Sequence, residues 1–97
     1  KKEEELIRVA EKRKTIDFGT LGVASASEAD DLQKIKGIGP FITEKLNALG
    51  IYKFSQLANM TSEIEDEVNI AIEFFPGRVK RDEWAKQARN LTGGEEE

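Results

Sequence analysis

Residues 35–40, with the sequence Ile-Lys-Gly-Ile-Gly-Pro, are the one stretch whose residue types and spacing suggest a specific chemistry. Two glycines on either side of an isoleucine allow a tight turn, and Pro40 suits the first position of a following helix. The amides near Gly37 and Gly39 would then lack partners at the positive end of that helix, where an anion such as phosphate binds. The glycines are equally well explained if they serve only to form the tight turn. Their spacing does not distinguish this structural role from phosphate binding.

Basic residues cluster around this hairpin. Residues 31–59 contain four lysines against two acids, and residues 76–91 contain five bases against two acids. Residues 60–75 hold five acids and no base, so the net charge of −4 conceals two basic stretches. Backbone phosphates are bound by such cations without reading of the bases. On these grounds the candidate nucleic-acid-binding residues are Gly37, Gly39, Lys34, Lys36 and Lys45.

Two short helices must position the hairpin. The first is predicted to begin at Leu32, capped by Asp30 or Asp31, and to end at the glycines. The second is predicted to begin at Pro40 and to end at Gly50, a residue type that often follows the last turn of a helix. Its apolar positions have helical spacing and should face the core: Ile42, Leu46 and Leu49.

The downstream chain has the same helical periodicity. We predict a short helix near Phe54, Leu57 and Ala58, and a longer one that is capped by Thr61 or Ser62 and includes Phe75 among its apolar positions. Asp82 should cap a last helix that turns Trp84, Ala88 and Leu91 inward, which favours Trp84 as a core residue over a base-stacking one. The residues expected to be largely buried are Leu32, Ile35, Ile38, Ile42, Leu46, Leu49, Leu57, Ile72 and Trp84.

The N-terminal third has weaker signals. Residues 1–14 favour a helix, with acids first and bases last, as the helix dipole prefers. Residues 15–30 read as a tether and linker, extended over 15–23 and packed on the module through Ile16, Phe18 and Leu21. The compact unit should span residues 31–91, and residues 92–97 should form a disordered acidic tail.

Composition excludes most enzymes and metal sites. The 97-residue chain has no cysteine and no histidine, which removes thiol nucleophiles, imidazole bases and the usual zinc ligands. We expect no catalytic residue, no metal and no cofactor, and we expect Glu63, Asp66 and Glu67 to form a solvated helix face. No apolar run approaches the ~20 residues that span a bilayer, so a cytoplasmic segment is expected. Residue 1 is Lys, which suggests a piece of a longer protein.

The run Asp31–Pro40, together with Glu44-Lys45-Leu46 and Leu49-Gly50-Ile51, resembles the helix-hairpin-helix motif of DNA repair and recombination proteins. The continuation through Phe54, Leu57, Ala58 and Thr61 is similar to the second unit of tandem domains of this kind. Residues 31–91, including Arg81-Asp82-Glu83-Trp84 and Gln87-Ala88, resemble the extensions of some bacterial NADH dehydrogenase and ribosomal proteins. The resemblance implies an all-α fold: a tandem helix-hairpin-helix-like bundle of about five helices with an N-terminal helix and an extended tether.

The resemblance also implies a role for the hairpin. In the DNA-binding families, its amides contact the phosphates of one strand, which assigns that role to Gly37, Ile38 and Gly39. Phe41 stands where many of those proteins have a basic residue, and it is either a contact for a partner or a peg under the N-terminal tether. Tyr52 is a second possible partner contact. Two functions remain open: weak, sequence-independent binding of nucleic acid, or an accessory domain that contacts other domains or a protein partner.

Overall fold

A computed structural model describes residues 1–93, and every regular element within them is a helix. The predicted all-α fold is therefore confirmed, whereas residues 94–97 of the predicted acidic tail lie outside the described residues. Short 3-10 turns occupy Lys12–Thr15, Ala26–Glu28 and Leu32–Lys34. The α-helices are α1 (Lys2–Glu11), α2 (Phe18–Leu21), α3 (Pro40–Leu49), α4 (Phe54–Ala58), α5 (Ser62–Ala71), α6 (Arg78–Arg81) and α7 (Trp84–Leu91).

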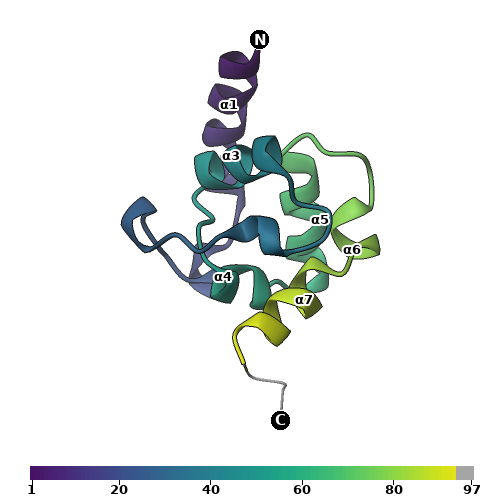
Figure 1. Cartoon of the computed structure of the whole chain (residues 1–97). Helices are drawn as coiled ribbons and strands as arrows, with labels where there is room; N and C mark the ends of the chain where they lie inside the picture. Colours follow the sequence, from purple (N-terminus) through teal and green to yellow (C-terminus); the bar gives the residue numbers. More distant parts are fainter. Residues whose placement is uncertain (94–97) are drawn as a thin grey trace.

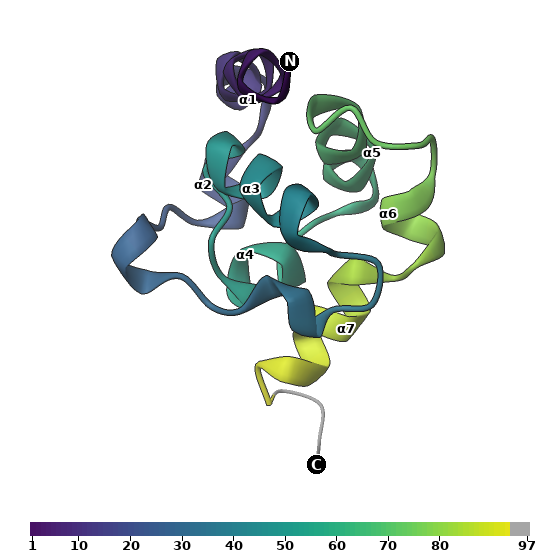
Figure 2. The same ribbon diagram turned by 45° about the horizontal axis from the view of Figure 1, so that its top comes forward.

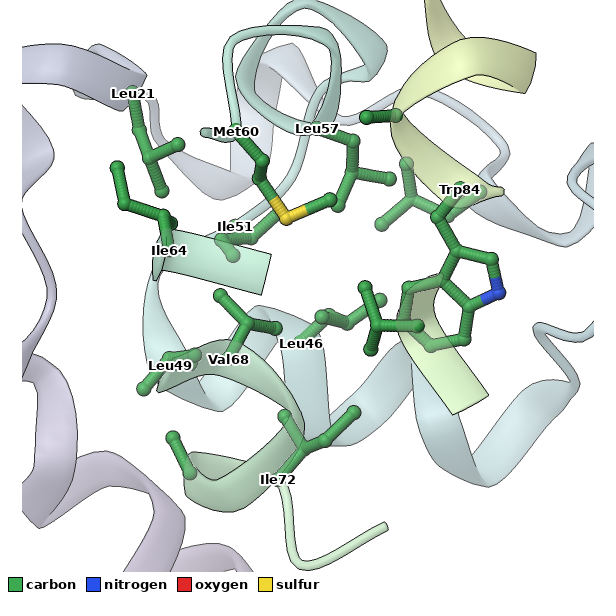
Figure 3. Close-up of a cluster of buried hydrophobic side chains, with 14 of the residues drawn as sticks. Leu21, Leu46, Leu49, Ile51, Leu57, Met60, Ile64, Val68, Ile72 and Trp84 are labelled. Atoms are coloured by element: carbon green, nitrogen blue, oxygen red, sulfur yellow. The ribbon is translucent and has the colours of Figure 1, made fainter. Parts of the chain in front are cut away.

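The core is formed where α3, α4, α5 and α7 meet (Figure 3). Leu46, Leu57, Ile72 and Trp84 are completely buried in it. Eight of the nine residues predicted to be buried are buried, and Ile42 is only partly so. Burial of this many apolar side chains is the main favourable contribution to the stability of a domain of this size.

Local capping signals fix the ends of the elements. The Asp31 side chain accepts a hydrogen bond from the Gln33 amide, and the Thr61 side chain accepts one from the Ile64 amide. Gly50 ends α3 in the left-handed conformation, with φ of 106°. Asp30, the other predicted cap, instead accepts from the Phe54 amide at 2.8 Å and fixes the start of α4.

Four local predictions are wrong. The predicted extended tether contains α2, although its apolar anchors Ile16 and Leu21 are buried as predicted. Phe75 and Leu91 are 67% and 42% exposed, because α5 ends at Ala71 and α7 turns Leu91 outward. Asp82 does not cap α7; the cap position belongs to Glu83, which has a positive φ of 55° and no side-chain capping bond.

The helices form one packed unit, with α7 along α4 and α1 against α3 (Figures 1 and 2). In Figure 2, α1 is seen nearly end-on, beside α3 and apart from α7. Helix α1 contributes one fully buried residue, Val9.

Ion pairs hold α1 in place. The Arg8 guanidinium donates two hydrogen bonds to the Glu73 carboxylate, at 2.8 and 2.9 Å, and the Lys12 ammonium lies 3.5 Å from it. The hydrogen bonds from Arg8 hold the pKa of Glu73 at about 2, against an ordinary value of 4.5. Glu73 follows α5 and has a positive φ of 56°, so the chain turns there and presents the carboxylate to α1.

Truncation of Leu46 to Ala should destabilise the fold by about 2–5 kcal/mol, because a fully buried leucine leaves a cavity when it is shortened. Chemical denaturation monitored through the fluorescence of Trp84 measures this loss. The matched control is truncation of Leu91, which is 42% exposed and should cost much less. Equal midpoints for the two variants would contradict the assignment of Leu46 to the core.

Docking of α1 should weaken in acid. Because the pKa of Glu73 is lower in the folded than in the unfolded chain, its carboxylate stabilises the fold above about pH 4.5. That contribution is lost as the pH falls from about 4.5 to about 2. The denaturation midpoint of Glu73→Gln should therefore vary less with pH in this window than that of the wild type. Glu3→Gln, on the exposed side of α1, is the control and should keep the wild-type pH dependence.

Candidate nucleic-acid interface

The hairpin turns through two glycines with different conformations. Gly37 has a φ of 102°, which only glycine adopts without strain, whereas Gly39 is extended, with φ of −101° and ψ of −170°. Ile38 between them is 5% exposed and anchors the turn in the core. Its amide donates to the Ile35 carbonyl at 3.1 Å and closes the turn.

The turn leaves donors at the start of α3. The Gly39 carbonyl accepts from the amide and the hydroxyl of Thr43, both at 2.9 Å, which fixes the first turn of the helix. The amides of Gly39, Phe41 and Ile42 donate to no acceptor within residues 1–93. These amides lie at the positive end of the helix dipole, so an anion is favoured there.

The side chain of Gln87 fastens the hairpin to α7. Its Oε1 accepts from the Lys36 amide at 2.9 Å, and its Nε2 donates to the Lys36 carbonyl at 3.2 Å. The Lys36 amide is therefore unavailable to a ligand. This contact could not be predicted from the sequence, because a glutamine in a predicted helix has no pattern that points to a partner 51 residues away.

The three candidate lysines are not equivalent. Lys34 and Lys36 are exposed next to the turn and form no ion pair within residues 1–93. Lys45 is 5% exposed, and its ammonium donates to the Ile72 carbonyl at 3.0 Å. The same ammonium lies 3.9 Å from the Glu5 carboxylate, so Lys45 is buried by contacts with α1 and with the residue that follows α5.

The two possible partner contacts also differ. The Phe41 ring lies under cations, 4.8 Å from the Lys45 ammonium and 5.6 Å from that of Lys2, so α1 covers it and not the predicted tether. Tyr52 lines a hollow of about 400 Å³ together with Phe18 and Val23. Trp84, the other candidate for base stacking, is fully buried and belongs to the core.

Residues 1–93 contain neither a metal-binding cluster nor a membrane-spanning helix. Within residues 1–93, no group of three acidic side chains is placed to hold a metal ion. None of the helices there has the length and apolar character to cross a membrane. The acids Glu63, Asp66 and Glu67 lie on the exposed side of α5, where Asp66 pairs with Lys80 at 3.1 Å.

The two hairpin glycines should respond differently to alanine. Gly37→Ala should destabilise the fold by at least about 1–2 kcal/mol because of its positive φ, and the added Cβ would also lie 2.6 Å from an oxygen of Asp82. At Gly39 an added Cβ meets nothing within 4 Å, so Gly39→Ala should change the stability by less than about 1 kcal/mol. Thermal melts of both variants measure this difference. A Gly37→Ala variant as stable as the wild type would contradict the packing at Gly37.

Residues 32–92 match the family model described as the RS2/RL21/YNQ2 HHH domain. The small ribosomal subunit protein uS2 of Methylobacterium radiotolerans is 47% identical over 62 residues, and the large ribosomal subunit protein bL21 of Hyphomonas neptunium is 39% identical over 71 residues. An uncharacterized 22.9 kDa protein in the nqo2 3′ region of Paracoccus denitrificans is 39% identical over 71 residues.

These alignments cover 64%, 69% and 73% of this chain, respectively, but only 17%, 32% and 33% of the relatives. The chain thus spans about a third or less of the length of these relatives, in which the matched region is a helical module of a larger protein. No solved structure matches it. The match over 32–92 confirms the resemblance inferred from the hairpin: the chain belongs to the RS2/RL21/YNQ2 family of helix-hairpin-helix domains.

Proposed function

We propose that this module binds nucleic-acid backbone phosphates weakly and without sequence preference, through the hairpin and the start of α3. The observation that carries the proposal is the set of unpaired amides of Gly39, Phe41 and Ile42, beside the exposed cations of Lys34 and Lys36. Backbone amides at a helix start bind one phosphate, and the lysines neutralise the phosphates next to it. No catalytic step is part of this function.

Contacts within the chain leave fewer groups free to bind a phosphate than the sequence predicts. The Lys36 and Ile38 amides are used within the chain, and the Lys45 ammonium is buried, which leaves two cations at the turn. Two phosphates neutralised by lysines correspond to a salt slope of about −2, well below that of strong non-specific binders. Useful affinity therefore requires avidity from other parts of a longer protein.

The relatives support a nucleic-acid ligand. Modules similar to this one occur in a protein of the small and a protein of the large ribosomal subunit. A ligand present in both subunits explains this distribution more simply than two unrelated protein partners, and RNA phosphates are such a ligand. A cytoplasmic location for this segment follows from the proposed ligand.

The second candidate function is a protein-interaction or tethering role. It is favoured by the hollow beside Tyr52, whose lining includes Phe18 and the 86% exposed Val23. Exposed apolar groups around a hollow of about 400 Å³ suit a protein side chain better than a phosphate. This candidate predicts binding to protein with no dependence on the hairpin lysines.

Charge reversal at the hairpin tests the first function. The variant Lys34→Glu with Lys36→Glu leaves the turn intact and should reduce binding to a fluorescein-labelled RNA or DNA duplex by at least about tenfold at ~50 mM salt. The wild type should show the same affinity for duplexes of different sequence. Fluorescence anisotropy measures both.

Lys1→Glu with Lys14→Glu is the matched control, because it changes the net charge equally on exposed N-terminal residues. If the control loses as much affinity as the hairpin variant, binding does not depend on the hairpin. Absence of wild-type binding at ~50 mM salt, where such contacts are strongest, rejects the proposed function and leaves the surface around Tyr52 as the candidate for a partner.

A further inference from the structure

The junction between α6 and α7 lies against the first glycine of the hairpin. A Cβ placed on Gly37 would be 2.6 Å from Asp82 Oδ2 and 2.9 Å from Trp84 Nε1. Gln87, which holds the hairpin through Lys36, also donates to the Asp82 carbonyl at 2.7 Å. The carboxylate of Asp82 is therefore held next to the proposed phosphate site.

A buried donor lies at the same place. Trp84 is completely buried, and its indole nitrogen has no hydrogen-bond acceptor within residues 1–93. The donor and the carboxylate of Asp82 both contact the space beside Gly37. The surroundings of Gly37 thus combine a polar group without a partner and a negative charge, next to amides that favour an anion.

Two arginine side chains pair with Asp82, and one of them is more exposed and less tightly packed than the other. Arg78 Nε lies 3.6 Å from Asp82 Oδ2, and its guanidinium packs on the rings of Phe74 and Phe75, at 5.3 and 5.9 Å. Arg81 Nε lies 3.3 Å from Asp82 Oδ1, but its side chain is 65% exposed. Packing on aromatic rings restricts Arg78, whereas Arg81 can exchange its partner without disturbing the core.

We propose that Arg81 is a further phosphate-binding residue of the hairpin site. In the free protein Arg81 pairs with Asp82, and a bound backbone phosphate replaces Asp82 as its partner. This inference rests on the proposed function. Apart from Lys34 and Lys36 in the preceding turn, the first turns of α3 offer no accessible cation, because position 41 is Phe and the Lys45 ammonium is buried. Arg81 supplies a cation from the α6–α7 junction, which is distant in sequence but packs against the hairpin. Asp82 limits the affinity because it competes with the phosphate for Arg81 and repels the phosphate.

Two substitutions in the whole chain, one expected to strengthen binding and one expected to weaken it, test the proposal. Asp82→Asn should strengthen binding to a fluorescein-labelled RNA duplex by about 3- to 10-fold, because it removes a negative charge and releases Arg81. Arg81→Gln should weaken binding by about 3-fold or more and make the salt slope shallower by about one. Arg81 is mostly exposed, so the second variant should keep the wild-type melting temperature even if the first does not.

Matched controls change the same charges elsewhere. Asp66 is also ion-paired, to Lys80 at 3.1 Å, and Arg89 is an exposed arginine that donates to the Ala58 carbonyl. The Arg81 inference is wrong if Arg81→Gln binds as Arg89→Gln does, or if a folded Asp82→Asn binds no more tightly than Asp66→Asn. If the wild type still binds in either case, only the Arg81 inference is rejected and the proposed function is not. Absence of binding by both the wild type and Asp82→Asn at ~50 mM salt overturns the function and the inference together.

Discussion

The contact between Gly37 and the α6–α7 junction joins the two ends of the module. Trp84 fills the core from one side and reaches the hairpin with its indole nitrogen, so the turn has no space for a side chain at Gly37. Gln87 adds hydrogen bonds to both backbone groups of Lys36. A tight turn on the surface of a small domain would otherwise be mobile, and these contacts hold the start of α3 in one conformation.

Much of the fold could be predicted because its signals are local. Pro40 and Gly50 mark the ends of α3, and Thr61 marks the start of α5, since each residue satisfies or removes backbone donors within one turn. Asp82 shows where local rules fail. An aspartate two residues before a helix is a reasonable cap, but here its carboxylate packs against a glycine 45 positions earlier, which no local pattern reveals.

The candidate site was predicted with less success, because its chemistry depends on which charges are already paired. Arg8 and Lys80 pair with Glu73 and Asp66, so much of the apparent basic character of the chain is satisfied internally. Lys34 and Lys36 remain unpaired within the described residues. The glycine spacing predicted a turn with a free amide at Gly39, but it did not reveal that the Ile38 amide closes the turn. The burial of Lys45 depends on how an N-terminal helix packs, which the short apolar stripe of that helix does not specify.

The cover that α1 places on Lys45 and Phe41 shows that the packed unit is longer than the segment matched by the family model. The family match begins at residue 32, but α1 contributes Glu5 and Lys2 to the surroundings of that ammonium and that ring. A fragment cut at residue 32 would bring a lysine and a phenylalanine into solvent beside the start of α3. Its surface there would be basic and aromatic, whereas in the intact chain α1 covers both groups, so the surface of a truncated domain would differ from that of the whole chain.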